Sequence, residues 1–180
     1  MDADYPSKGV LFPRRNTACS YDEIDDTAAR LQPQWLISIL GPKERLPWPD
    51  VVPAERRLRL AFEDTVVMAG GPQPEHVRDL IAFLRLWNRD GPLLIHYRGG
   101  ISRSTAAALI ALALFHPGRE ACAASLLRAR GPHARPSAPM IAFADQQLRL
   151  DGRLVAAVAT MSPPDWSRCD VITLPKEAEE

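Results

Sequence analysis

The chain has 180 residues, of which 46% are hydrophobic and 24% are charged, a composition typical of a folded domain and not of a disordered chain. Its 22 basic and 22 acidic residues give a net charge of zero, which argues against general binding to nucleic acid or to an acidic membrane surface. The three cysteines are far apart and predict neither a zinc site nor a disulfide framework, so we expect a reducing compartment.

No segment has the pattern of a signal peptide or a membrane span. The first four residues include two aspartates, where a signal peptide would carry basic residues followed by an apolar stretch. The longest apolar run, residues 106–115, is about half of the roughly 20 residues that cross a bilayer. We therefore expect a cytoplasmic protein without a membrane partner.

Apolar runs in the first half of the chain predict strands and one helix. Residues 9–12 predict a short strand, and residues 20–31, which open with a capping box, predict a helix. The continuous apolar run 35–40 predicts a buried strand, and the period-two alternation of residues 57–62 predicts a strand with one exposed face. The proline-rich segment 43–53 between them predicts a loop.

The second half continues the alternation and then becomes helical. Residues 74–87 place apolar side chains on one helical face, residues 93–95 predict a short buried strand, and residues 96–102 predict a turn. Further helices are predicted at three places: 103–115, 120–130 and about 138–158. Alternating strands and helices predict a single α/β domain over residues 1–162, with a central, mostly parallel sheet flanked by helices and a loose tail at 163–180.

The turn at residues 96–102 has the residue types of an anion site. It links a buried strand to a helix through Gly99 and Gly100, and glycines allow backbone amides to turn toward an anion. The helix start adds free amides and a partial positive charge, and Arg103 offers a planar fork to a phosphate. A purely structural glycine turn is the alternative, but it does not account for His96 and Arg103 in the same segment.

This segment resembles the signature loop of the cysteine-dependent protein tyrosine and dual-specificity phosphatases, His-Cys-x-x-Gly-x-x-Arg-Ser/Thr. His96, Gly100, Arg103 and Ser104 match it in register. The wider span 58–154 is similar to small bacterial predicted tyrosine phosphatases. The resemblance implies a phosphatase-like fold with a phosphate-binding loop, a phosphorylated ligand and no cofactor or metal. It implies phosphate contacts from Arg98, Gly99, Gly100, Ile101, Ser102 and Arg103.

Tyr97 departs from this pattern, because it stands where the family has its nucleophilic cysteine. A free phenol has a pKa of about 10, and lowering it to 7 would need about 4 kcal/mol of preferential phenolate stabilisation. The ring also places its oxygen several ångströms beyond the position of a sulfur. An inward ring would fill the phosphate cradle, and an outward ring would leave the cradle without a nucleophile. Cys122 cannot replace the missing nucleophile, because we expect its side chain to be buried as a packing residue on a later helix.

The other catalytic positions implied by the resemblance are retained. Asp64, 33 residues upstream of Tyr97 and just after a predicted strand, fits the general acid, and a carboxylate that only caps a turn is the alternative. Trp48-Pro49-Asp50 spells the acid loop of tyrosine-specific enzymes but precedes that strand, so we favour Asp64. Ser104 matches the hydroxyl that helps the cysteine to leave, and His96 matches the residue that orders the loop.

A basic run follows the next helix, at Arg128, Arg130, His133 and Arg135. It is either a solvated face or, as the resemblance implies, a group beside the cradle that steers anions. We leave these two interpretations open.

Three hypotheses follow for function. The first is a catalytically impaired phosphatase-like protein, or pseudophosphatase, that binds a phosphorylated ligand or protein partner. The second is an active phosphomonoester hydrolase with an unusual nucleophile or an activated water. The third is an interaction scaffold with a blocked cradle and no ligand.

Overall fold

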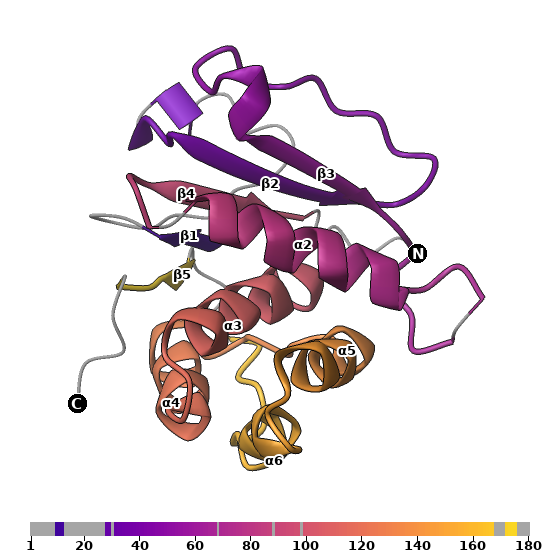
Figure 1. Ribbon diagram of the computed structural model, residues 1–180, viewed down its shortest axis with the longest axis vertical. Coiled ribbons are helices and arrows are strands. Elements are labelled where there is room, and N and C mark those ends of the chain that lie inside the picture. The colour runs from indigo at the N-terminus through magenta and orange to yellow at the C-terminus, as the bar shows by residue number, and fades with distance from the viewer. Residues whose placement is uncertain are drawn as a thin grey trace.

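The computed structural model describes residues 10–12, 28–29, 31–67, 69–87, 89–97, 99–167 and 172–175. Within these ranges five strands form one sheet in the order β3-β2-β4-β1-β5 (Figure 1). The strands are β1 (Val10–Phe12), β2 (Trp35–Leu40), β3 (Arg57–Ala61), β4 (Leu93–His96) and β5 (Ile172–Thr173). The α/β fold with a largely parallel central sheet is therefore confirmed.

Three parallel strands form the part of the sheet that carries the site. β2 lies between β3 and β4 and is parallel to both, with Ser38 opposite Arg59 on one side and opposite His96 on the other. The carboxyl ends of these strands therefore meet at one edge, which is where ligands bind in open α/β sheets. β1 pairs with β4 in the antiparallel direction.

The strand β5 corrects the expectation of a loose tail for residues 172–174. Ile172 and Thr173 pair in parallel with β1, and Ile172 and Leu174 are fully buried. A Cβ atom at Gly131 would lie 2.4 Å from Ile172 Cδ1, so the isoleucine packs directly on the glycine that follows α4. Two residues of strand show no periodicity of their own, which is why the pattern gave no signal here.

Five α-helices of the described chain lie on one side of the sheet (Figure 1), and the 3-10 helix η1 (Ala54–Arg56) lies on the other. The α-helices are α2 (Pro74–Trp87), α3 (Arg103–Phe115), α4 (Glu120–Arg130), α5 (Ala138–Leu148) and α6 (Arg153–Ala159). α3 contacts α2, α4 and α5, and its residues from Arg103 to Ala113 are all buried. A helix that is apolar on every side belongs in the core, and here it places its N-terminus beneath the predicted anion loop.

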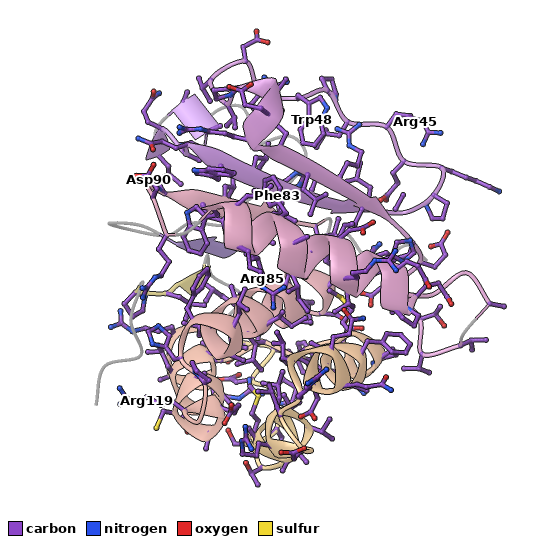
Figure 2. All side chains as sticks on the ribbon, viewed as in Figure 1. Arg45, Trp48, Phe83, Arg85, Asp90 and Arg119 are labelled. Atoms are coloured by element: carbon purple, nitrogen blue, oxygen red, sulfur yellow. The ribbon has the colours of Figure 1, made fainter. Side chains whose placement is uncertain are left out.

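The opposite face of the sheet has a smaller apolar cluster of Leu36, Val52 and Leu94, against which Leu46 and Trp48 pack. The predicted loop at 43–53 therefore covers this face, and Arg59 stacks on Trp48 with its guanidinium carbon 4.1 Å from the ring centroid. Trp48 packs on this face of the sheet, and Phe83 of α2 packs in the main core on the other face (Figure 2).

The structure corrects the expected burial of Cys122. Cys122 is exposed on α4, not buried, because the apolar face of this helix is formed by Ala123, Ala124 and Leu127 instead. The helix predicted for residues 20–31 lies mostly outside the described residues. No helix in the described part of the chain is long and apolar enough to cross a membrane.

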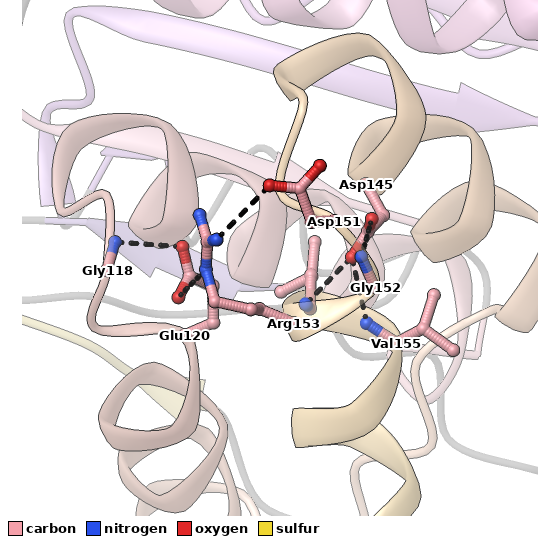
Figure 3. A network of polar contacts seen from close by, with 8 residues as sticks. Gly118, Glu120, Asp145, Asp151, Gly152, Arg153 and Val155 are labelled. Carbon is pink, nitrogen blue, oxygen red and sulfur yellow. Dashed lines mark hydrogen bonds and ion pairs between the residues drawn. The ribbon is translucent and has the colours of Figure 1, made fainter.

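The single helix predicted from 138 to 158 is two helices, α5 and α6. The chain turns between them with positive φ angles of 56° at Arg149, 51° at Asp151 and 81° at Gly152. Asp145 of α5 accepts hydrogen bonds from the amides of Gly152 (2.7 Å), Leu154 (2.8 Å) and Val155 (3.2 Å), as Figure 3 shows. Its buried carboxylate caps α6 from the previous helix.

We expect Asp145→Ala to lower the free energy of unfolding by about 2–4 kcal/mol, because three amides lose their acceptor at a helix start. Urea denaturation measures the change. Asp151→Ala is the matched control: Asp151 is exposed and lies 3.7 Å from Arg153 Nη1, and loss of such an ion pair costs less than about 1 kcal/mol. Equal losses in the two variants would contradict the capping role.

Candidate functional site

The candidate site lies at the carboxyl edge of the parallel strands. β4 ends at His96, Tyr97 follows, and the loop 99–102 leads into the first turn of α3 at Arg103. Asp64 reaches the same edge from the segment after β3, because β3 and β4 both run parallel to β2. The sheet topology thus brings Asp64 together with residues that lie 32 or more positions later in the chain.

The loop is held by neighbouring backbone and side-chain groups. Gly100 has a φ of 62°, a left-handed conformation that favours glycine. The carbonyl oxygen of Ile101 accepts hydrogen bonds from Thr105 Oγ1 at 2.6 Å and from the amide of Arg135 at 2.9 Å. The amide of Ser137 donates to Ser102 O at 3.3 Å. These bonds place residues 135–137 directly against the loop.

The Tyr97 ring points inward, over the loop. Three of its side-chain atoms lie 3.1–3.4 Å from the position that a Cβ atom at Gly99 would take, so the ring needs the space that this glycine leaves. The guanidinium carbon of Arg103 lies 3.8 Å from the ring centroid, which is a close cation–π stack. Of the two orientations considered from the sequence, the structure has the inward one.

Arg103 is engaged by its own chain. It is 4% exposed, its Nη1 donates to the carbonyl oxygen of Phe62, and its guanidinium carbon lies 5.8 Å from the centroid of the Phe62 ring. Its Nε lies 4.0 Å from Asp64 Oδ2, at the outer limit of an ion pair. The tyrosine, the backbone and the carboxylate therefore surround the side chain that the signature loop would offer to a phosphate.

The Asp64 carboxylate is fixed at the same place, since Ser102 Oγ donates a hydrogen bond to its Oδ1 at 2.8 Å. Asp50 is exposed and does not line this site, and its neighbour Trp48 packs on the opposite face of the sheet. The geometry thus favours Asp64 over Asp50 as a site residue.

The surroundings of Tyr97 make it a poor nucleophile. Burial raises the pKa of the Tyr97 phenol above its ordinary value of 10, and the carboxylate of Asp64 raises it further. The Arg103 side chain lowers it, but burial is the larger effect. The hydroxyl therefore stays protonated at neutral pH, and the phenolate needed for attack on phosphorus is not populated.

His96 is fully buried behind the loop and shares a hydrogen bond of 2.6 Å between its Nε2 and Ser38 Oγ. Burial, together with the positive charge of Arg59, lowers the pKa of His96 to about 3, so the imidazole is neutral. Sequence reasoning missed Ser38, although a hydroxyl within the apolar run 35–40 was a signal. Ser104 is buried beside the loop, and within the described ranges its hydroxyl has no hydrogen-bond partner.

A pocket of about 530 Å³ opens above the Tyr97 ring. Its polar lining is Asp64, Thr65, Ser102, Arg135 and Ser137, and the rest is Val66, Tyr97, Ile101, Pro136, Ala138 and Trp166. Trp166 is 48% exposed and comes from the segment expected to be a loose tail, so no sequence pattern pointed to it. Of the basic run, the pocket lining includes Arg135 alone; Arg128 donates to Pro132 O.

The remaining predicted residues fall into two groups. Gly99, Gly100 and Ile101 form the loop itself, whereas Arg98 lies outside the described residues. Among the described residues no group of three or more His, Cys, Asp or Glu side chains is placed to hold a metal ion.

Comparison with solved structures shows the fold of the dual-specificity phosphatases. Human DUSP28 has a TM-score of 0.57 at 18% identity, covering 80% of this chain and 95% of that chain. A single-residue variant of human DUSP28 has a TM-score of 0.52 at 24% identity, covering 76% and 89%. A mouse dual-specificity phosphatase complexed with zinc tungstate has a TM-score of 0.56 at 17% identity, covering 87% and 96%. No protein-family model and no curated protein matches the chain by sequence.

The buried imidazole makes the stability of the fold depend on pH. An unfolded histidine binds a proton near pH 6.5, whereas folded His96 does so only near pH 3, so the unfolded chain binds more protons between these values. The contribution of His96 is therefore complete above pH 6.5 and is lost as the pH falls, by up to about 1.4 kcal/mol per unit. Urea denaturation from pH 7 to 4.5 should show this slope reduced in His96→Asn.

Ser38→Ala is the control for this experiment. It removes the hydrogen bond to His96 but keeps the buried imidazole, so we expect lower stability at every pH and an unchanged slope. Equal slopes in the native protein and His96→Asn would show that His96 does not carry the pH dependence.

Proposed function

We propose that the protein is a phosphatase-fold binding protein without cysteine-based hydrolysis, a pseudophosphatase, that holds a phosphorylated ligand or a phosphorylated protein partner. The proposal rests on one observation: at the position of the nucleophile, the Tyr97 ring lies over Gly99 and stacks at 3.8 Å on Arg103. The cradle lacks a thiolate, and the ring occupies the volume that a transferring phosphoryl group needs.

Binding, as distinct from hydrolysis, is supported by what remains around the ring. The pocket of about 530 Å³ is large enough for a phosphorylated side chain, and it combines apolar walls with a few polar groups. The mouse protein with the same fold was solved with tungstate, a tetrahedral oxyanion of the same shape class as phosphate. An interaction scaffold that binds no ligand would not need a pocket with both apolar walls and polar groups.

The roles of the individual residues follow from this proposal. Ile101 and Ser102 frame the ligand from the loop, and His96 positions the loop through its hydrogen bond to Ser38. Ser104 retains the family position without a leaving thiolate to assist. Asp64 stays beside the ligand site with its carboxylate accepting from Ser102.

An active hydrolase is the second candidate, and one observation favours it. Asp64 still lies within 4.0 Å of Arg103, the pairing of acid and cation that a phosphatase uses. An activated water would then have to replace the thiolate, and the Tyr97 ring covers the cation that would bind the substrate.

Hydrolysis of an aryl phosphate separates the two candidates. We expect the native protein to hydrolyse p-nitrophenyl phosphate no faster than buffer, and Tyr97→Cys to exceed Tyr97→Ser by at least about tenfold, because only the thiol supplies a nucleophile of suitable pKa. Tyr97→Ser is the matched control, since it also removes the ring. Alkylation should abolish the Tyr97→Cys activity. Native activity that survives alkylation and is lost in Arg103→Ala would establish the hydrolase instead.

Binding itself separates the proposal from a scaffold. We expect calorimetric titration with a short phosphotyrosine peptide to give a dissociation constant below about 1 mM, which corresponds to roughly 4 kcal/mol. The same peptide with unmodified tyrosine should bind at least about tenfold more weakly, because it lacks the charge that the polar lining recognises. Equal binding of the two peptides, or binding of neither, would contradict the proposal.

A further inference from the structure

Among the described residues two arginines lie at the candidate site, and they differ in what their guanidinium groups can reach. Arg103 is the cation of the signature loop, and Arg135 comes from the segment that is hydrogen-bonded to Ile101 O through its amide. The two side chains differ in burial and in hydrogen-bond partners. These differences decide which of them can bind the anion of a ligand that enters from solvent.

Arg103 is closed off from the pocket. Its guanidinium is stacked under Tyr97, bonded to the carbonyl oxygen of Phe62 and near Asp64, and the side chain is only 4% exposed. It does not line the pocket of about 530 Å³, whereas the Tyr97 ring does. The ring thus separates the loop cation from the space that a ligand occupies.

Arg135 has the opposite surroundings. It is exposed and lines the pocket, and within the described ranges its guanidinium has neither a hydrogen-bond acceptor nor an ion-pair partner. Its backbone is nevertheless fixed, because its amide donates to Ile101 O at 2.9 Å and the nearby amide of Ser137 donates to Ser102 O. An anchored backbone with an unengaged guanidinium is suited to binding a phosphate by two parallel hydrogen bonds.

The negative charge of Asp64 in the pocket lining does not prevent an anion from binding at Arg135. In the described part of the chain Asp64 is the one carboxylate that lines the pocket, and it already contacts the Ser102 hydroxyl at 2.8 Å and the Arg103 Nε at 4.0 Å. A phosphate would therefore settle on the side of Arg135 and away from Asp64. Tyr97 and Trp166 would face the apolar part of the same ligand.

We propose that anion recognition in this protein has moved from Arg103 to Arg135, so that an aryl phosphate binds with its phosphate on Arg135 and its ring against Tyr97 and Trp166. The inference rests on the proposed function, because it names the cation that the ligand would use. The phosphate would then lie near the rim of the pocket, with the Tyr97 ring between it and Arg103 at the base of the loop.

The test is calorimetric titration of the full chain with phenyl phosphate at low and at physiological salt. We expect Arg135→Gln to weaken binding by about tenfold or more and to reduce its dependence on salt, because the variant removes a direct charge-assisted contact. Arg130→Gln is the matched control, since Arg130 is also exposed and close in sequence but does not line the pocket. It should stay within about twofold of the native protein.

A second comparison uses Tyr97→Ala, which removes the ring between the pocket and Arg103. In that background the effect of Arg135→Gln should shrink, because the ligand regains access to the loop cation. Native-like binding by Arg135→Gln, or an equal loss in Arg130→Gln, would overturn the inference and leave the proposed function standing. Failure of the native protein to bind phenyl phosphate at all would overturn both.

Discussion

The stacking of the Tyr97 ring on the Arg103 guanidinium is the contact on which the whole site depends. It decides that the loop cation is buried, that the pocket begins above an aromatic floor, and that the space left by Gly99 is filled. A cysteine at the same position would leave that space open. One side chain thus forms the floor of the pocket.

Most of the fold could be predicted because its signals are local. The runs at β2 and β3 and the helical spacing of α2 reflect burial on one or two faces, which sequence periodicity records. The break between α5 and α6 was missed because it depends on a tertiary contact, the Asp145 carboxylate reaching amides seven to ten residues ahead. The strand β5 was missed because its two residues are specified by pairing with β1 and packing on Gly131.

The site shows the same division. The chain positions of Asp64, His96 and Arg103 could be predicted from spacing and resemblance, and the parallel strands bring them to one edge. The orientation of Tyr97 could not, because it depends on the room at Gly99 and on the charge of Arg103, which meet only in the folded chain. The exposure of Arg135 and the contribution of Trp166 depend likewise on how distant segments pack around the loop.

The strand order has a consequence for how the protein is made. β1, at residues 10–12, is hydrogen-bonded between β4 and β5, so its outer edge stays unpaired until residue 172 has been synthesised. Such an edge offers free amides and carbonyls to other chains. Of the described strands, β1 is synthesised first but gains its second partner last, so the nascent sheet presents an adhesive edge from the time β4 is made until β5 is made.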